Sequence, residues 1–443
     1  MTNIKQDSMT DLKQDSPLGV RVRSRKVRDL VTFLMVAGPG IIVMEADNDA
    51  GAVSTYIQAG AQYGTHLLWI MLLLLPITFF IQEMVVRLGI ATGEGHAALI
   101  YHRFGKWWGR FSLFDLLLVN FLTLVTEFAA VSLAASAAGI QPQLAVPLSI
   151  GILIAIVTTG SYRNWERMAI CLCLLDVSWL LLAFFAHPVA GDAIHNTLVP
   201  NIPPTGITND LVFLLIGIVG TTIAPWQLFF QQSCIADKKL RFQDLKWSRL
   251  DTFIGACFTV LVGGCMMLVG DLGFRNNIDF RDPADLAVHL VPFAGPIFKN
   301  FILLMMCNAA VLGATAVSLA SAWAYSEVNG WTNSLQMSWR RAPGFYIVYA
   351  LCCGAAGGIV LIPNLPLQPI VVGVQVLAGM MLPVAIIFLQ LLLNDRELLG
   401  DEFVNKPWNN YINWTIIIVL FLMSLVLVVQ QLAPNLFPTS SPG

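Results

Sequence analysis

Long apolar runs follow one another along the chain, and each is close to the length of a membrane-crossing helix. A helix needs about 20 apolar residues to cross a hydrocarbon core roughly 30 Å thick. The runs lie near residues 39–60, 66–90, 109–138, 145–160, 166–187, 208–235, 251–272, 288–326, 345–362, 367–394 and 412–433. The pattern predicts an all-α polytopic membrane protein with about eleven transmembrane helices.

Two of these runs are interrupted by polar residues next to Gly or Pro. The first contains Asp47-Asn48-Asp49-Ala50-Gly51-Ala52, and the sixth contains Thr221-Thr222-Ile223-Ala224-Pro225-Trp226-Gln227. Such a break at mid-membrane depth unwinds the helix and frees backbone groups that protein, water or an ion must satisfy. Breaks at corresponding positions predict two inverted repeats, spans 1–5 and 6–10, with span 11 appended and a substrate site at the bilayer midplane.

The composition supports one membrane domain and disfavours other classes of protein. Of the 443 residues, 56% are hydrophobic and only 12% are charged, which excludes a soluble globular protein. We expect a disordered tail at 1–30, a transporter domain at 31–433 and a second tail at 434–443. No Walker loop, HExxH motif or Ser/His/Asp set appears, so we expect no enzyme activity, no cofactor and no nucleic-acid partner.

The distribution of basic residues predicts the orientation. Lys and Arg gather in the N-terminal tail and in alternate loops, whereas the tail after Asn413 has none. Cytoplasmic loops carry the excess of Lys and Arg. We therefore expect a cytoplasmic N-terminus, an extracellular C-terminus and a place in the plasma membrane.

Several short motifs at span ends resemble those of the NRAMP divalent-metal transporters. The resemblance covers nearly the whole chain and rests on Gly38-Pro39-Gly40, Gln58-Ala59-Gly60-Ala61, Gln82 to Gly89, Gln375-Val376-Leu377 with Leu382-Pro383, and Arg396 to Gly400. It implies a LeuT-like inverted repeat with broken helices 1 and 6, and transport of a divalent metal ion.

The two breaks depart from the family pattern at the metal site. The family has Asp-Pro-Gly-Asn in span 1 and Met-Pro-His in span 6, where this chain has Asp49 to Ala52 and Ala224-Pro225-Trp226. The carboxylate is kept, but the Asn and the soft Met thioether are replaced by Ala, which leaves oxygen donors. The resemblance implies a metal site whose positions are Asp49, Ala52, Thr221, Ala224, Gln227 and Gln375.

A second group of departures concerns protons. Trp226 and Gln231 stand where the family has histidines, and neither titrates; in span 3, Glu127 keeps one acid whereas Ala130 replaces the other. We therefore expect no proton coupling. The combination resembles the NRAMP-related magnesium transporters, because Mg²⁺ prefers oxygen ligands and keeps part of its water shell.

Some residues have two interpretations from sequence alone. Glu45 and Asp47 either line the ion pathway or lie solvated at its mouth. Thr221 either faces the ion or bonds back to the preceding turn. Gln227 and Gln375 either face the ion or pair between helices. The weaker candidates are Glu127, Asp115 and Asp176, and Glu127 is either a residue of the cation pathway or a satisfied buried acid.

The first hypothesis for the function is uncoupled uptake of Mg²⁺, and also of Mn²⁺, by alternating access. The second is proton-coupled Mn²⁺ or Fe²⁺ symport of the NRAMP type. The third is transport of an amino acid, against which Asp49 argues because it favours a cation. We expect a monomer whose partners are the metal ion and the lipid bilayer.

Overall fold

The computed structural model describes residues 25–432, and within them every regular element is a helix. Nine helices in this range are long and apolar enough to cross a membrane; one of the nine is the α11–α12 pair that forms the broken sixth span. The shorter apolar helix α7 and the broken first span, α2–α3, bring the described spans to eleven. The predicted fold class is confirmed.

The described helices, in chain order, have the following bounds: α1 Arg25–Val36, α2 Pro39–Glu45, α3 Ala50–Tyr63, α4 Leu68–Thr92, α5 His96–Phe104, α6 Lys106–Ala137, α7 Pro142–Val157, α8 Tyr162–Leu175, α9 Ser178–Phe185, α10 Ala190–Leu198, α11 Asn209–Thr222, α12 Pro225–Lys238, η1 Phe242–Asp244, α13 Leu245–Arg275, α14 Pro283–His289, α15 Val291–Val328, α16 Pro343–Val360, α17 Leu367–Leu393, α18 Arg396–Phe403 and α19 Pro407–Leu432.

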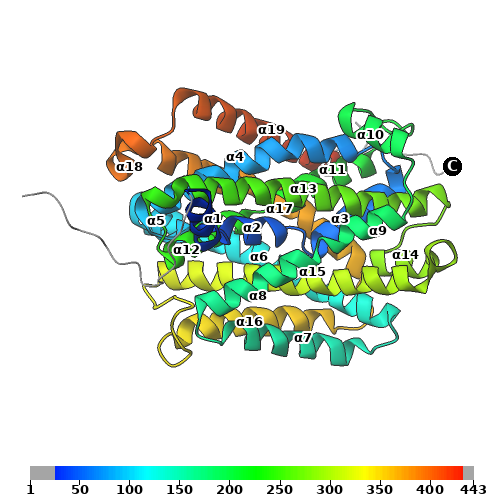
Figure 1. Ribbon diagram of the computed structural model, residues 1–443, viewed down its shortest axis with the longest axis horizontal. Coiled ribbons are helices and arrows are strands. Elements are labelled where there is room, and N and C mark those ends of the chain that lie inside the picture. Colours follow the sequence, from blue (N-terminus) through cyan, green and yellow to red (C-terminus); the bar gives the residue numbers. More distant parts are fainter. Residues whose placement is uncertain (1–24, 433–443) are drawn as a thin grey trace, which may run out of the picture.

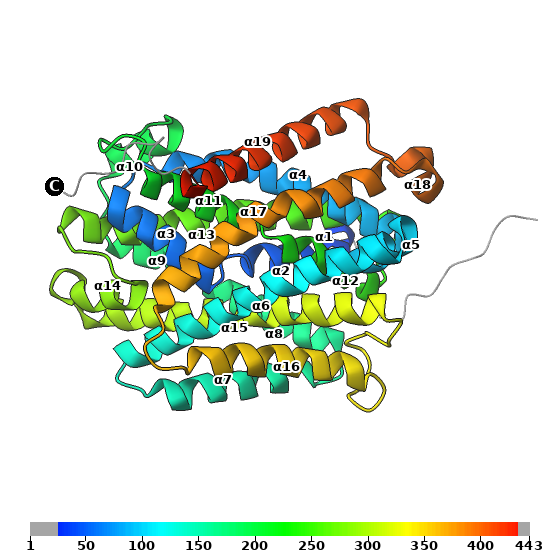
Figure 2. The ribbon, with the colours of Figure 1, turned by 180° about the vertical axis from the view of Figure 1, so that it is seen from behind.

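The long helices run roughly along one axis, with the broken helices near the middle of the bundle (Figures 1 and 2). In these views α19 lies along one edge, and α7 and α16 lie along the opposite edge. The packing follows the predicted repeat: α3 lies along α13, α12 lies along α4, and α6 packs against α15. In the predicted repeat, span 1 corresponds to span 6 and span 2 to span 7. The contact of span 1 with span 7 therefore matches the contact of span 6 with span 2, as an inverted repeat requires.

Small residues let α3 and α13 approach closely. A Cβ added at Gly60 would lie 1.9 Å from the Met267 carbonyl oxygen, and one at Gly270 would lie 2.2 Å from that of Ile57. Small residues at helix contacts are the usual means by which membrane helices gain packing energy. The second half of the broken first span is therefore held firmly against span 7.

Side chains cap the start of each helical half of the broken first span. The Asp251 carboxylate on α13 accepts hydrogen bonds from the amides of Gly38 (3.1 Å), Gly40 (2.7 Å) and Ile41 (3.3 Å) at the start of α2. Asp49 is the N-cap of α3 and accepts from the Ala52 amide at 2.8 Å. Free amides at helix starts are thus paired within the protein.

The structure also has features that the apolar pattern did not predict. Span 5 is interrupted at Asp176 and Val177, which separate α8 from α9. Short helices α5, α10, α14 and α18 occupy connections between spans. The boundary expected at residue 30 falls inside α1, and the tail expected at 434–443 lies outside the described residues.

Candidate functional site between the broken helices

A row of four buried carboxylates leads from the first break to span 3. Each is within electrostatic range of the next, and each is at most 3% exposed: Glu45, Asp47, Asp49 and Glu127. None of the ion pairs found among residues 25–432 includes any of them. Buried acids without a basic partner are costly inside a membrane and mark an ion path or site.

Asp49 and Glu127 converge where α3, α6 and α15 meet. Glu127 accepts a hydrogen bond from the Ala50 amide at 3.2 Å, and its other carboxylate oxygen has no partner. A Cβ added at Gly313 of α15 would lie 2.7 Å from the Asp49 Cβ and 2.8 Å from that free oxygen. Gly313 therefore leaves the room in which the two carboxylates approach each other.

Gln227 joins the two breaks. Its amide nitrogen donates to Asp47 on the link between α2 and α3, and its oxygen accepts from Gln82 of α4 at 2.9 Å. The second Asp47 oxygen has no partner. Of the two interpretations of Gln227, pairing between helices therefore holds in this conformation. This pairing fixes the first turn of α12 against the segment that links α2 to α3.

Gln375 of α17 lies against the first turn of α3. Its amide nitrogen has no hydrogen-bond partner and lies 1.6 Å from the position that a Cβ at Gly51 would take. An oxygen of Asp49 is 3.0 Å from the same position. The terminal amide of Gln375 and the carboxylate of Asp49 therefore share one small space, which exists because residue 51 is glycine.

Thr221 lies in the last turn of α11, one residue before the helix ends at the second break. Its hydroxyl is buried and has no hydrogen-bond partner, so it does not bond back to the preceding turn. The neighbouring Gly220 packs on α17, where an added Cβ would lie 2.1 Å from the Gln375 carbonyl oxygen. Thr221 and Gln375 thus belong to the same wall of the site.

The other predicted positions carry no oxygen ligand in their side chains. Ala52 and Ala130 are buried methyl groups, and Ala224 is the extended N-cap of α12. Trp226 packs edge-on to Phe230, with ring centroids 5.9 Å apart, and its indole nitrogen has no partner.

Gln231 is hydrogen-bonded to span 7 rather than to the acidic groups. Its amide nitrogen donates to the Thr252 hydroxyl of α13 at 3.0 Å. Glu45 and Asp47, in contrast, are fully enclosed at 0% and 1% exposure, so the interpretation as solvated residues at a pathway mouth is wrong for this conformation.

Sequence reasoning missed three residues that shape this site: Gln82, Asn48 and Gly313. Gln82 was noted only as part of a motif, yet an amide inside an apolar run is itself a signal of interhelical pairing. Asn48 is fully buried and its oxygen has no partner. No local pattern marks Gly313, because its role depends on the approach of α3 and α6 to α15.

The donors near the breaks are oxygen-rich and few. Within residues 25–432, no three side chains of His, Cys, Asp or Glu are placed to hold a metal ion together. An ion here would be held by one or two carboxylates together with amide, hydroxyl or backbone oxygens and water. This donor set suits a hard cation that keeps part of its hydration shell.

One buried histidine lies outside the spans, in α5. Burial lowers the pKa of His96 to about 4. The hydrogen bond between ring Nδ1 and the Gln232 amide oxygen, 2.9 Å long, acts in the opposite direction but is the smaller effect. The ring also meets Phe229 edge-on at 4.7 Å. His96 is therefore neutral at physiological pH. The other five histidines are exposed or half-buried.

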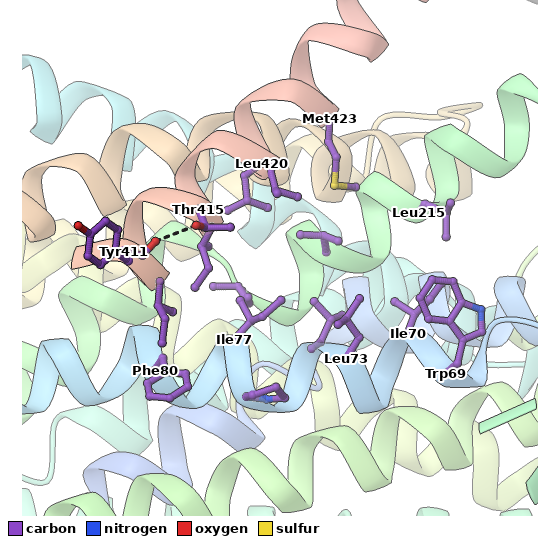
Figure 3. Close-up of a pocket in the computed structure, with 17 residues that line it drawn as sticks. Trp69, Ile70, Leu73, Ile77, Phe80, Leu215, Tyr411, Thr415, Leu420 and Met423 are labelled. Atoms are coloured by element: carbon purple, nitrogen blue, oxygen red, sulfur yellow. Dashed lines mark hydrogen bonds between the residues drawn. The ribbon is translucent and has the colours of Figure 1, made fainter. Parts of the chain in front are cut away.

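A cavity of about 660 Å³ lies away from the acidic groups, between α4, α11 and α19 (Figure 3). Its wall is formed by apolar side chains such as Ile70, Leu73 and Leu420. The Thr415 hydroxyl at its edge is already bonded to the Tyr411 carbonyl at 2.8 Å. Such a wall offers a cation no ligands, so this cavity is not the ion site.

Comparison with known families gives a match over most of the chain. The model of the family described as natural resistance-associated macrophage protein-like, Nramp, matches residues 40–430. The divalent metal cation transporter MntH of Staphylococcus aureus (strain bovine RF122 / ET3-1) is 24% identical over 427 residues, 90% of this chain and 91% of MntH. MntH of strain Newman is equally similar.

Solved structures share the fold. The manganese transporter of Eremococcus coleocola, in complex with an aromatic bis-isothiourea compound, superposes with a TM-score of 0.72 at 19% identity, over 93% of this chain and 90% of that one. The nucleobase-cation-symport-1 family transporter Mhp1, in a closed conformation, gives a TM-score of 0.52 at 12% identity, over 92% and 94% of the two chains. The likeness extends to the inverted-repeat architecture.

Proposed function

Because this chain belongs to the Nramp family, we propose that it carries a hard divalent cation, Mg²⁺ and also Mn²⁺, through the site between its two broken helices. Its relatives bear the names divalent metal cation transporter and manganese transporter. The proposal for this chain is narrower: uncoupled entry of Mg²⁺ by alternating access, as in the NRAMP-related magnesium transporters that the sequence resembles.

One observation carries the proposal: carboxylates without basic partners line both halves of the first break. Burial of an ionised carboxylate costs several kcal/mol unless an opposite charge or full hydrogen bonding offsets it. Asp47 and Glu127 each keep one oxygen with no partner. A divalent cation would supply the missing charge, with Asp49 as its anionic ligand.

The choice of Mg²⁺ follows from the donors and from the space around them. Mg²⁺ demands octahedral oxygen coordination and sheds water reluctantly, so proteins usually hold it by one or two carboxylates with several waters kept. Ala52 and Ala224 are buried and present no side-chain donor, which leaves part of the coordination to water in this proposal. Thr221 offers a free hydroxyl and Gln375 a free terminal amide, whereas Gln227 would have to release Gln82 before its oxygen could face the ion or its waters.

The proposed absence of proton coupling rests on the two positions at which the family has histidines. Trp226 and Gln231 stand there, and neither side chain titrates. An inside-negative membrane potential favours entry of a divalent cation by about 4.6 kcal/mol per 100 mV, which is twice the value for one charge. The potential alone drives uptake.

A second candidate is proton-coupled uptake of Mn²⁺ or Fe²⁺. Two observations favour it: the names of the relatives, and the position of Glu127 next to Asp49, where one proton could be shared. Amino-acid transport is disfavoured, because the carboxylate of Asp49 already occupies the start of α3, where a substrate carboxylate would bind.

The proposal includes an orientation. The N-terminus lies in the cytoplasm and the C-terminus lies outside the cell, because Lys and Arg are concentrated in the tail and loops assigned to the inner side of the plasma membrane. The protein works as a monomer with its site inside a single bundle.

Calorimetric titration of Mg²⁺, Mn²⁺ and Ca²⁺ against the purified protein and its Asp49→Ala variant tests the site. We expect Mg²⁺ to bind the wild type and to lose most of its affinity in the variant. Asp115→Ala, a carboxylate on α6 outside the site, is the matched control and should bind normally. Unchanged binding in Asp49→Ala would remove the proposal, and selective Mn²⁺ binding without Mg²⁺ would favour the second candidate.

A further inference from the structure

A second group of buried polar side chains lies where α8 meets both α2 and α15. Asp176 occupies the interruption between α8 and α9, Asn308 lies within α15, and Glu45 ends α2. Their exposed fractions are 0%, 6% and 0%. Of the three, only Glu45 belongs to the acidic residues at the break.

Asn308 and Asp176 are hydrogen-bonded to each other, and each keeps one side-chain oxygen without a partner. The Asn308 amide nitrogen donates to the Leu172 carbonyl at 3.1 Å and to one Asp176 oxygen at 2.9 Å. The amide oxygen of Asn308 and the second carboxylate oxygen of Asp176 have no partners. Both donor hydrogens of the amide are used, so the two unpartnered oxygens belong to side chains that are hydrogen-bonded to each other.

Glu45 adds a second carboxylate within electrostatic range of Asp176. Its hydrogen bonds are weak: the Thr259 hydroxyl and the Asn48 amide nitrogen each lie 3.5 Å from one of its oxygens. At that distance a hydrogen bond contributes little. No ion pair in the described part of the chain involves Glu45 or Asp176.

We propose that Glu45, Asp176 and Asn308 form a second site, for a hard cation held by two carboxylates and one amide oxygen. Two like charges buried together repel, and a bound cation removes both the repulsion and the unpaired oxygens. All the donors are oxygens, the ligands that Mg²⁺ and Na⁺ prefer, and no sulfur or imidazole is bonded to them.

The second site differs from the first in the helices that build it. Asp49, Gln227 and Gln375 come from α3, α12 and α17, whereas Asp176 and Asn308 come from span 5 and α15. Glu45 links the two, because it is in electrostatic range of Asp47 as well as of Asp176. Occupancy of the second site would hold α2 against α8 and α15 through Glu45.

Equilibrium dialysis of the purified, full-length protein tests the second site, with Mg²⁺ in one arm and Na⁺ in the other. We expect Asp176→Asn, which keeps the size of the side chain, to bind one equivalent of cation fewer than the wild type. We expect Asn308→Ala to bind that equivalent with lower affinity. Asp115→Asn removes another carboxylate from a span and should keep the wild-type stoichiometry. The arm in which the equivalent is lost identifies the cation.

The proposal is overturned if Asp176→Asn and Asn308→Ala bind Mg²⁺ and Na⁺ with wild-type stoichiometry and affinity. Cation-induced stabilisation, read as a rise in melting temperature, checks that both variants are folded. The result is separable from the proposed transport function. Asp49→Asn should lose only the equivalent of cation bound at the first site. If the protein binds the Asp176-dependent equivalent but shows no metal uptake, the transport proposal is contradicted and the second site is not.

Discussion

Replacement of Gly51 by alanine should separate ion binding from folding. The new Cβ would lie 1.6 Å from the Gln375 amide nitrogen and 3.0 Å from an Asp49 oxygen, so the Gln375 side chain must leave the space it shares with Asp49. Its terminal amide has no hydrogen-bond partner to lose. Because the displaced atoms are the flexible end of a side chain, the fold should tolerate the change.

The magnitude follows from the single group that is displaced. Losing one polar contact to a charged group costs about 1.5–3 kcal/mol, which corresponds to roughly a tenfold to hundredfold weaker cation binding. The fold should lose at most about 2.5 kcal/mol, because an overpacking cost of about 1–3 kcal/mol is offset by the better helix propensity of alanine, worth about 0.5–1 kcal/mol.

Calorimetric titration of Mg²⁺, combined with thermal melting in detergent, measures both quantities. Gly373→Ala on the same helix as Gln375 is the matched control, since an added Cβ there meets nothing within 4 Å. Gly60→Ala is the opposite control, because its Cβ would meet the Met267 backbone and should prevent folding. Wild-type affinity in a folded Gly51→Ala protein would refute the placement of Gln375 at the site.

Three further substitutions test other parts of the account. Ala224→Met supplies a soft thioether and should raise the preference for Mn²⁺ over Mg²⁺ by roughly tenfold; an unchanged ratio in competition titrations would argue against this corner of the site. His96→Gln should remove a pH dependence. Burial depresses the pKa of His96 to about 4, so the wild type is fully stabilised above its unfolded pKa of about 6.5 and loses up to about 3 kcal/mol as the pH falls to 4. Melting curves of the two proteins should therefore converge at low pH, and a constant gap would contradict the assignment. Glu83→Gln removes the ion-pair partner of Arg87, whose side chain is 7% exposed, and that of the more exposed Arg249, and should cost about 3 kcal/mol in thermal melting; a loss below about 0.5 kcal/mol would mean that the bonds of Arg87 to Asn405 and to the Phe403 carbonyl suffice.

The apolar pattern predicted the spans because bilayer thickness sets helix length. The expected run at 367–394 is α17, Leu367–Leu393, and the two predicted breaks separate α2 from α3 and α11 from α12. Pro225 marks the second break directly, since it stands at the first position of α12. These features are local in sequence, which is why a single sequence indicates them.

The side-chain partners could not be predicted, because they depend on how distant helices approach. The sequence left two interpretations open for Gln227, and the structure shows it paired with Asp47 and Gln82, of which the latter lies 145 residues away in sequence. The interruption of span 5 at Asp176 has no Gly or Pro to signal it. The contact of Asp176 with Asn308 joins residues 132 positions apart.

Flux in proteoliposomes tests the central claim most directly. The protein is reconstituted with a magnesium-sensitive dye and a pH-sensitive dye in the lumen, and an inside-negative potassium diffusion potential is applied. We predict that lumenal Mg²⁺ rises with the potential, that lumenal pH stays constant, and that Asp49→Asn abolishes the flux. Acidification of the lumen in step with metal entry, or entry of Mn²⁺ without any entry of Mg²⁺, would contradict uncoupled magnesium transport.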